Sequence, residues 1–348
     1  MAGTDRAGPQ ADGPGGAPGE EPTGPPADRP AAPPIEHLPD GTLAIDTLTG
    51  GMRSVTAGYL IPAARPTLIE CGPALAVEHV IAGLRALGFG PDDLAFLVVT
   101  HVHLDHAGGA GAVAAAFPNA TVVVSELGAR HLHDPERLNR SARQVYGPLF
   151  DTVYGACRPT DAQRILGVAD GHELDLGGGR RLELLATPGH AKHHVGVHDL
   201  GTGAIFSGDS VGVKLPSMSV IRPATPPADF HLEAALASLH RYRVREPSRV
   251  YLAHYGAVDP PDAALAEAED RLRLWAATAE AAYHEEDELD HVAATLARRF
   301  ADEMQADDHE DDPDAERRLA LLSDVRSNAA GLLRYLRRRD EGTLTPLG

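Results

Sequence analysis

Four of the six residues from 101 to 106 have side chains that bind metal ions: His101, His103, Asp105 and His106. Imidazole nitrogen suits zinc and iron, and a carboxylate adds the negative charge that holds a second cation. The cluster directly follows residues 94–100, an apolar run with valines that is typical of a buried strand. We interpret the cluster as a metal site in a tight loop rather than as a solvated polar loop.

Three more candidate ligands stand farther along the chain, each where a strand-like segment ends. They are His190 after residues 181–186, Asp209 after 204–207, and His254 after 250–253. A rigid strand that passes into a loop is a good place to hold a reacting group. A lone histidine at one such place is more often an ordinary residue, but this recurring pattern indicates one shared site.

The spacing of these residues resembles the metallo-β-lactamase superfamily, whose pattern is H-x-H-x-D-H, then a later His, a later Asp and a last His. The resemblance covers about residues 40–260. The segments 100–109 (THVHLDHAGG), 187–190 (TPGH) and 207–209 (SGD) are close to the glyoxalase II and lactonase branches. This resemblance implies an α/β fold, a four-layer αββα sandwich with the site at one edge.

The resemblance also implies a role for each ligand. The first metal ion would be held by three histidines, His101, His103 and His190. The second would be held by Asp105, His106 and His254, and Asp209 would bridge both ions. We expect two divalent ions, with zinc as the first choice and iron or manganese as alternatives, because the same nitrogen and oxygen ligands accept all three.

Two cations a few Å apart can share one water molecule and lower its pKa from about 15.7 towards about 7, so that hydroxide exists at neutral pH. This bridging hydroxide could attack a carbonyl carbon or a phosphorus atom, and no serine or cysteine nucleophile is needed. The second metal could stabilise the negative charge that develops. We expect Asp105 and Asp209 to be catalytic, with Asp105 orienting the hydroxide and carrying a proton to the leaving group.

Other residues are candidates to support the ligands or to touch substrate. The family's first motif usually has Asp after a strand, whereas this chain has Glu70, which could accept a hydrogen bond from a ligand histidine or be a solvated charge. Residues 211–228 could form a substrate wall or an ordinary crossover loop. The remaining candidates are His194, Lys214, Met218, Arg222 and Tyr255.

The residues around the expected ligands do not identify the substrate. Glyoxalase II typically has T-x-G-H where this chain has residues 191–194 (AKHH), and no tyrosine follows Asp209 as it does in some lactonases. We expect a hydrolase of an ester, thioester or lactone of a small molecule. The alternatives are a phosphodiesterase or nuclease on the same fold, and an iron-dependent oxidoreductase similar to a persulfide dioxygenase. A flavin-linked diiron enzyme and a non-catalytic scaffold fit less well.

The chain is predicted to have three parts. Residues 1–34 are rich in glycine, proline and alanine, which is typical of a disordered tail. Residues 35–260 form the metallo-β-lactamase-fold domain, in which Asp229 is the expected N-cap of a helix. Residues 261–348 form a helical extension, with amphipathic helices, an exposed acidic linker at 301–316 and a last helix at about 315–338.

Charge and composition limit the classes of binding partner that we expect. The net charge of −19 repels phosphate backbones, so we expect no nucleic-acid partner. Two cysteines form no disulfide framework, and no apolar run is long enough for a membrane helix or typical of a signal peptide. We expect a cytoplasmic protein that acts on a small molecule without a membrane partner, and whose C-terminal helices could form a homodimer.

Overall fold

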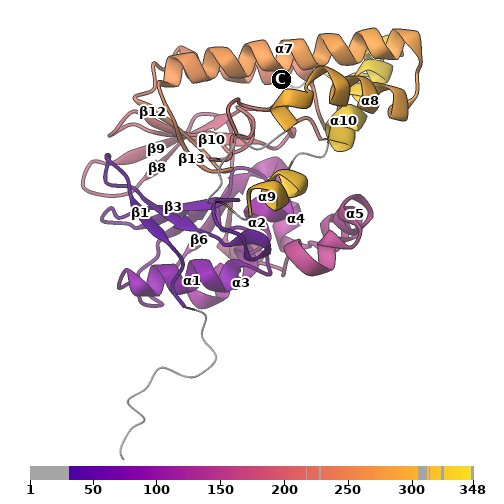
Figure 1. Ribbon diagram of the computed structural model, residues 1–348. Helices are drawn as coiled ribbons and strands as arrows, with labels where there is room; N and C mark the ends of the chain where they lie inside the picture. Colours follow the sequence, from indigo (N-terminus) through magenta and orange to yellow (C-terminus); the bar gives the residue numbers. More distant parts are fainter. Residues whose placement is uncertain are drawn as a thin grey trace, which may run out of the picture.

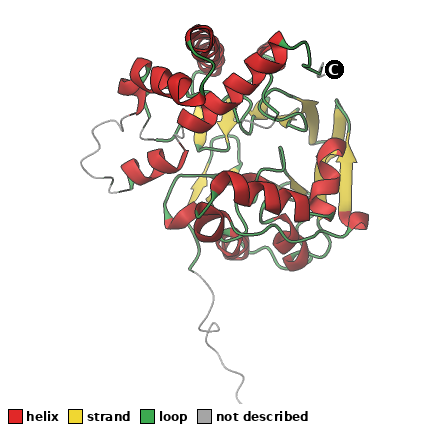
Figure 2. Ribbon diagram, turned by 90° about the vertical axis from the view of Figure 1, so that its right-hand side faces the viewer, coloured by secondary structure: helices red, strands yellow, loops and turns green. Residues whose placement is uncertain are grey.

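Two β-sheets lie face to face, and helices cover both outer sides (Figures 1 and 2). The computed structural model describes residues 31–216, 218–226, 229–304, 312, 314–322 and 325–345. Most of the predicted N-terminal tail, residues 1–30, lies outside the described residues. The predicted four-layer αββα sandwich with a C-terminal helical region is confirmed.

The first sheet has seven strands in chain order: β1 Ile35–His37, β2 Leu43–Asp46, β3 Ala57–Ile61, β4 Thr67–Ile69, β5 Phe96–Val98, β6 Thr121–Ser125 and β7 Ile165–Val168. Strands β1 to β4 pair antiparallel, and β4 to β7 pair parallel. The parallel strands β4 and β5 are entirely buried, as expected for strands of a sheet that is covered on both faces. Their C-terminal ends meet at one edge of the sheet.

The second sheet has six strands in the order β13 Gly256–Val258, β12 Arg249–Leu252, β11 Ala204–Phe206, β10 Val195–Asp199, β9 Arg181–Ala186 and β8 His172–Asp175. Strand β10 is antiparallel to both β9 and β11, and β11 is parallel to β12. Strands β9, β11 and β12 therefore run in the same direction. Their C-terminal ends lie at a common edge.

Helices pack on the outer face of each sheet (Figure 1). On the first sheet lie α1 Val77–Ala86 and α3 Ala110–Ala116. Beside its β6–β7 end lie α4 Glu126–His133, α5 Glu136–Tyr146 and a π-helical turn at Phe150–Tyr154. The break between α4 and α5 falls at Asp134-Pro135, because a proline disfavours the helical conformation of the residue before it. Short 3-10 turns occupy Thr49–Gly51, Ala162–Arg164 and Ala301–Met304.

Helices α6 Leu232–Arg243 and α7 Pro261–Glu285 cover the second sheet, and α8 Leu289–Arg299 and α10 Val325–Asp340 pack against α7. The apolar face predicted for α7 is confirmed, since Leu265, Ala268, Leu272, Trp275 and Ala279 are all buried. Among the described helices, none has the length and apolar character to cross a membrane.

The two sheets are joined by a buried aromatic cluster. The rings of Tyr59, Phe206 and Tyr251 lie 5.1–5.4 Å apart, one from the first sheet and two from the second. The hydroxyl of Tyr59 donates to the carbonyl oxygen of Leu252 at 2.5 Å, and the amide of Ala57 donates to that of Ala253 at 2.9 Å. These contacts fix the end of β12 against the first sheet.

Two local predictions were wrong. The segment 101–106 is not wholly a loop, because Leu104–Ala107 forms the short helix α2. Helix α6 is capped by His231, whose Nδ1 accepts from the amide of Ala234 at 3.4 Å, and Asp229 instead forms an ion pair with Lys192 at 3.4 Å. The chain is still extended at His231, so the helix begins after it rather than after Asp229.

The end of the chain also differs from the prediction. The single last helix is replaced by α9 Ala315–Leu322 and α10, with residues 323–324 outside the described part. Part of the predicted acidic linker is not solvated, because Glu303 in the turn Ala301–Met304 forms an ion pair with Arg271 of α7. Residues 305–311 and 313 of that linker lie outside the described part.

Helix α10 packs closely on the segment that precedes α6. The amide of Thr225 donates to Oδ1 of Asn328 at 2.7 Å, and its hydroxyl donates to the carbonyl oxygen of Asn328 at 3.0 Å. A Cβ atom on Gly331 would overlap the carbonyl oxygen of Thr225. Glycine is therefore needed at position 331 for the backbones to approach.

We expect Gly331→Val to lower the free energy of unfolding by about 1–3 kcal/mol, because backbone atoms cannot move aside as a flexible side chain can. Thermal and urea unfolding followed by circular dichroism measure this effect. Arg334→Val, at an exposed position of the same helix, is the matched control and should leave stability within about 0.5 kcal/mol. Equal stability of the two variants would contradict the close packing of α10.

Candidate metal centre

The seven predicted ligands gather where the strand ends of the two sheets meet. From the first sheet, the segment after β5 carries His101, His103, Asp105 and His106, the last two on α2. From the second sheet, the ends of β9, β11 and β12 are followed by His190, Asp209 and His254. The parallel direction of these strands explains why residues more than 150 positions apart lie together.

One half of the centre contains only imidazole nitrogens. The Nδ1 atom of His103 lies 2.9 Å from Nε2 of His101 and 3.0 Å from Nε2 of His190. His101 and His190 are buried, at 0% and 5% exposure. Three nitrogens that converge on one point from two segments have the donor set and spacing that suit a cation such as zinc.

The other half combines imidazole with carboxylate. One oxygen of Asp105 lies 3.5 Å from Nε2 of His106 and 3.4 Å from Nε2 of His254. These three side chains form a second group whose ligand atoms all lie within 4.8 Å of one another. A hard carboxylate with two histidines is a donor set for a divalent cation.

The carboxylate of Asp209 lies between the two groups. Its Oδ2 atom is 3.5 Å from Nε2 of His190, and its Oδ1 atom is 3.3 Å from Nε2 of His106 and 3.5 Å from Nε2 of His254. Both ring nitrogens of His106 and Oδ1 of Asp209 are buried without a hydrogen-bond partner among the described residues. Buried polar atoms that lack partners are costly. Bound cations would satisfy Nε2 of His106 and Oδ1 of Asp209, whereas Nδ1 of His106 faces Glu70.

A chain of hydrogen bonds behind the ligands selects which nitrogen each one presents. The hydroxyl of Thr100 donates to Glu70, so it accepts from Nδ1 of His101 at 3.0 Å and leaves Nε2 of that ring with its lone pair. Glu70 also lies 3.4 Å from Nδ1 of His106, on the side away from Asp209. Glu70 thus occupies the predicted position behind a ligand histidine, His106. Thr100 connects Glu70 to a second ligand, His101.

Backbone carbonyl groups orient two more ligands in the same way. Nδ1 of His190 donates to the carbonyl oxygen of Ala224 at 3.0 Å, and Nδ1 of His254 donates to that of Val55 at 3.0 Å. Each bond leaves Nε2 unprotonated and directed at the centre. The segment 211–228 therefore supports the site through the backbone of Ala224.

His194 holds the turn that carries Asp209. The amide of Asp209 donates to Nε2 of His194 at 3.2 Å, so Nδ1 bears the proton and donates to the hydroxyl of Thr187 at 2.9 Å. A Cβ atom on Gly208 would lie 2.5 Å from the hydroxyl oxygen of Thr100 and 2.6 Å from Nε2 of His194. Only glycine allows the turn to pack between these two side chains.

The electrostatics differ between the two halves. Burial lowers the pKa of His101, His103 and His190, that of His103 to about 3, so all three are neutral at neutral pH. Burial also disfavours the charged form of His106, but Asp209, Asp105 and Glu70 outweigh it and raise its pKa well above the usual value. The first half is thus neutral, and the second is rich in negative charge.

The two carboxyl groups of the centre are ionised. Burial raises the pKa of Asp209, but His106, His254 and His190 lower it by more, so the pKa falls well below its ordinary value. The pKa of Asp105 is likewise lowered, since the effect of His106 and His254 exceeds that of burial. Ionised carboxylates can serve directly as metal ligands.

The other predicted substrate residues contact different parts of the structure. The backbone amide of Lys214 donates to the carbonyl oxygen of His254 at 3.0 Å. Tyr255 packs against the cluster between the sheets, and Met218 packs with Leu215. Arg222 is buried near Arg271 of α7; burial, with a smaller effect of Arg271, lowers its pKa to about 10.

Two tyrosines beside the centre were missed by the sequence prediction. The rings of Tyr146 at the end of α5 and Tyr154 in the π-helical turn lie 4.2 Å apart at 31°. Burial raises the pKa of Tyr146 well above 10, with further contributions from Asp105 and Asp209. Within the described part of the chain, its hydroxyl makes no hydrogen bond. No motif marks Tyr146, because its proximity to the ligands arises only from tertiary packing.

We expect Glu70→Gln to weaken metal binding about 10- to 100-fold, because the neutral amide holds the Thr100–His101 pair and His106 less firmly than a carboxylate does. Competition with a chelator at neutral pH measures the affinity. Glu78→Gln, on the exposed face of α1, is the control. Equal affinity in the two variants would show that the carboxylate of Glu70 does not orient ligands.

Comparison with known proteins agrees with this geometry. Residues 50–254 match the family model of the metallo-beta-lactamase superfamily. A metallo-beta-lactamase fold-containing protein of Sulfurisphaera tokodaii, ST1585, is 32% identical over 220 residues, which are 60% of this chain and 80% of that protein. The N-acyl homoserine lactonase AttM of Agrobacterium fabrum is 32% identical over 111 residues, but the match spans only 32% of this chain and 38% of the lactonase.

Solved structures extend the comparison to the fold. The crystal structure of ST1585 superposes with a TM-score of 0.54 and 29% identity, over 64% of this chain and 80% of that chain. A metallo-beta-lactamase family protein from Thermus thermophilus shares the fold at 21% identity, with a TM-score of 0.58 over 90% of this chain and 93% of its own. By its sequence motif, its fold and its relatives, the chain belongs to the metallo-β-lactamase superfamily.

Proposed function

We propose that the protein is a dinuclear metal-dependent hydrolase that cleaves an ester, thioester or lactone of a small molecule. The observation that carries this proposal is the position of Asp209, whose two carboxylate oxygens face the two groups of ligands. A single carboxylate between two sets of donors is the arrangement that two cations with a shared water molecule require.

The two ions would be held by His101, His103 and His190 on one side, and by Asp105, His106 and His254 on the other. The carboxylates of Asp105, Asp209 and Glu70 supply negative charge that would balance most of the charge of two divalent ions. When bound, two divalent ions provide an activated water at neutral pH and positive charge for the oxygen that becomes negative. Histidine with carboxylate favours zinc, and the same donors accept iron and manganese.

Asp105 is the residue we assign to proton handling. It is the more accessible of the two central carboxylates, with 12% of its side chain exposed compared with 7% for Asp209. Its lowered pKa keeps it ionised between turnovers, so it can accept a hydrogen bond from the attacking water and orient it. Once protonated, such an acidic group would release its proton readily to the leaving oxygen or sulfur.

Tyr146 is the residue we assign to substrate binding at the centre. It is only partly buried, its hydroxyl has no hydrogen-bond partner among the described residues, and the charges of Asp105 and Asp209 reach it. Its raised pKa keeps the phenol protonated at neutral pH, so it remains a hydrogen-bond donor. A neutral donor beside two carboxylates suits a substrate carbonyl oxygen that gains negative charge.

We expect Tyr146→Phe to lower kcat/KM about tenfold or more, because a hydrogen bond to a charged group contributes about 1.5–3 kcal/mol. Steady-state kinetics on an activated ester, together with metal content, test this role. Tyr283→Phe on α7 is the control. A Tyr146→Phe variant with full metal content and unchanged kcat/KM would exclude a substrate contact.

The alternative functions are less well supported. A phosphodiesterase on small substrates would use the same centre, but a net charge of −19 opposes the approach of nucleic acid. A mononuclear iron oxidoreductase would bind one ion, so the group of Asp105, His106 and His254 would hold no metal. The similarity to a lactonase, although it covers 38% of that protein, places lactones among the first substrates to test.

We expect about two metal ions per chain by elemental analysis, and hydrolysis of an ester, thioester or lactone in parallel assays with phosphodiester and oxygen-uptake controls. The double variant His103→Ala with Asp209→Ala removes one ligand of the first group and the central carboxylate, so it should lose both metal and activity. His284→Ala with Asp262→Ala, both exposed on α7, is the matched control.

Three results would contradict the proposal. Unchanged metal content in the His103 and Asp209 double variant would exclude the ligand assignment. One iron per chain with oxygen consumption would replace the hydrolase with an oxidoreductase. Turnover of phosphodiesters alone would keep the centre but change the bond that it cleaves.

A further inference from the structure

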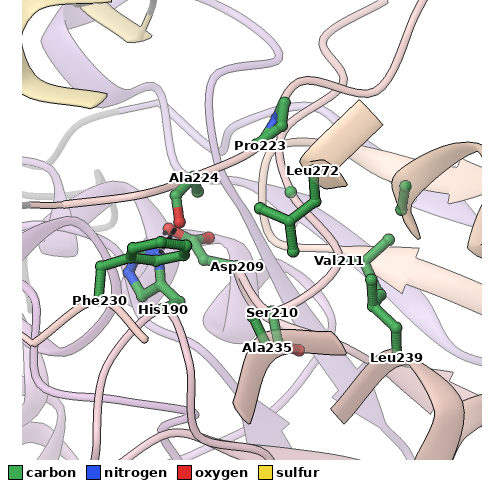
Figure 3. Close-up of a pocket in the computed structure, with 12 residues that line it drawn as sticks. His190, Asp209, Ser210, Val211, Pro223, Ala224, Phe230, Ala235, Leu239 and Leu272 are labelled. Carbon is green, nitrogen blue, oxygen red and sulfur yellow. Dashed lines mark hydrogen bonds and ion pairs between the residues drawn. The ribbon is translucent and has the colours of Figure 1, made fainter. Parts of the chain in front are cut away.

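The metal centre is closed on the side of the second sheet and its helices. In Figure 3, His190 and Asp209 lie close to Phe230 and Ala224, and Leu272 of α7 lies near them. The pocket that these residues line has a volume of about 10 Å³, which is about the room that one water molecule needs. A substrate therefore has no room on this side of the centre.

The ligands that solvent reaches belong to the segment after β5. Of the seven ligands, only His103 and Asp105 are partly exposed, and the other five are buried. His193 lies beside His103, with ring centroids 6.2 Å apart and the ring planes at 84°. A substrate that approaches His103 therefore meets His193.

His193 is a buried histidine with an unused polar atom. It is 5% exposed, and its Nδ1 atom has no hydrogen-bond partner among the described residues. It belongs to none of the groups of metal-binding atoms found in the described part of the chain. Burial lowers the pKa of His193 to about 2, so the neutral ring offers one donor and one acceptor. Since buried polar groups are normally hydrogen-bonded, this ring can receive a bond from a substrate or donate one to it.

Three cations surround His131 of α4, the next histidine beyond His193. The rings of His193 and His131 lie 6.4 Å apart. The Nε atom of Arg130 donates to Nε2 of His131 at 3.3 Å. Burial lowers the pKa of His131, and the charges of Arg130, Lys192 and Arg137 lower it further. We call these three residues the cationic cluster.

The cationic cluster is only partly neutralised. The Nζ atom of Lys192 lies 3.4 Å from Oδ1 of Asp229, which is the one carboxylate among the main charges that act on His131. Arg130 and Arg137 form no ion pair with any described residue, and all three cations are exposed. Unpaired cations near the accessible ligands, in a chain of net charge −19, create a local field that attracts an anion.

We propose that His193 and the cationic cluster bind an anionic substituent of the substrate, so that the preferred ester, thioester or lactone carries a carboxylate or a phosphate. This inference rests on the proposed hydrolase function for its reaction, and on His193 and the cluster for its choice of substrate. Since His193 separates His103 from His131, the substituent lies several bonds away from the carbonyl carbon that is attacked.

Substrates that differ only in the anionic group test the inference on the metal-loaded full chain. The 4-nitrophenyl esters of hexanoate, adipate and 6-phosphonohexanoate share the leaving group and a six-carbon acyl chain. We expect kcat/KM to be about fivefold higher for an anionic ester than for the hexanoate ester, which is the effect of a favourable exposed ion pair, and to lose this advantage at high salt. The larger advantage identifies carboxylate or phosphate as the group that is bound.

A second pair of substrates places the charge on the leaving group instead. It consists of 4-acetoxybenzoate and the neutral 4-acetoxybenzamide. Equal kcat/KM for charged and neutral substrates in both sets would overturn the inference.

Variants connect the preference to the named residues. Arg130→Gln with Arg137→Gln should lower the ratio of kcat/KM for the anionic ester to that for the neutral ester about fivefold. Arg85→Gln with Arg298→Gln removes the same charge at exposed positions of α1 and α8, and it should keep the wild-type ratio. Metal content and circular dichroism show whether each variant keeps its centre and its fold.

The contribution of His193 is tested by two substitutions. His193→Phe removes both ring nitrogens, so it should lower the same ratio. His193→Gln keeps a donor and an acceptor, and it should retain more of the ratio than His193→Phe. Equal ratios in the wild type and a metal-loaded His193→Phe variant would exclude His193 from the anion site.

Calorimetric titration gives a readout that needs no turnover. Hexanoate offers one carboxylate, which the metal ions can bind, whereas adipate and 6-phosphonohexanoate offer a second anionic group to the cationic cluster. We expect one of the two dianions to bind about fivefold more tightly than hexanoate, and the Arg130 and Arg137 double variant to lose this difference.

The two proposals can fail separately. Tighter binding of a dianion that depends on Arg130 and Arg137, without hydrolysis of any ester, would overturn the proposed reaction and support the anion site. Ester hydrolysis with the same substrate preference in the wild type and in the Arg130 and Arg137 double variant would support the reaction and overturn the anion site.

Discussion

Three carboxylates and five histidines, most of them buried, lie where the strand ends of the two sheets meet, and this is the constraint on which the rest of the site depends. Glu70, Asp105 and Asp209 are held in a region where water cannot solvate them fully. Charge in such a place is stable only if it is balanced nearby. His106 balances part of it through its raised pKa, and the neutral histidines of the other half offer lone pairs but no charge. Bound divalent cations would supply the missing positive charge and partners for the buried atoms that lack them.

This constraint extends outward from the ligands, because a histidine that binds a cation through one nitrogen needs its other nitrogen protonated and directed at an acceptor. The acceptors come from separate segments: Thr100 for His101, and the carbonyl oxygens of Ala224 and Val55 for His190 and His254. The C-terminal helices belong to the same arrangement. Helix α10 holds the residue after Ala224 through Asn328, and residues of α7 line a small pocket beside Asp209. The orientation of the centre therefore depends on both sheets and on the helical region.

Much of the fold and of the candidate site could be predicted from the sequence, because some sequence patterns act over short distances along the chain. Ligand types at fixed short spacings, as in 101–106, predict a metal site without any knowledge of the fold, and the period of apolar residues predicts α7 and the buried strands. Short-range steric effects also place the break at Asp134-Pro135. Helix caps were less predictable, as His231 and Asp229 show, because several residues near a helix start can serve and the local chain direction decides among them.

Only the tertiary structure decided which nitrogen each histidine presents, that Glu70 faces both Thr100 and His106, and that the charge of Asp105 reaches Tyr146. Each depends on contacts between segments separated by tens to hundreds of residues, for which no local pattern exists. The residue types in the sequence determined which atoms can bind metal. The parallel direction of β9, β11 and β12, and the joining of the two sheets, determined that those atoms converge, because only the folded chain fixes distances between strand ends.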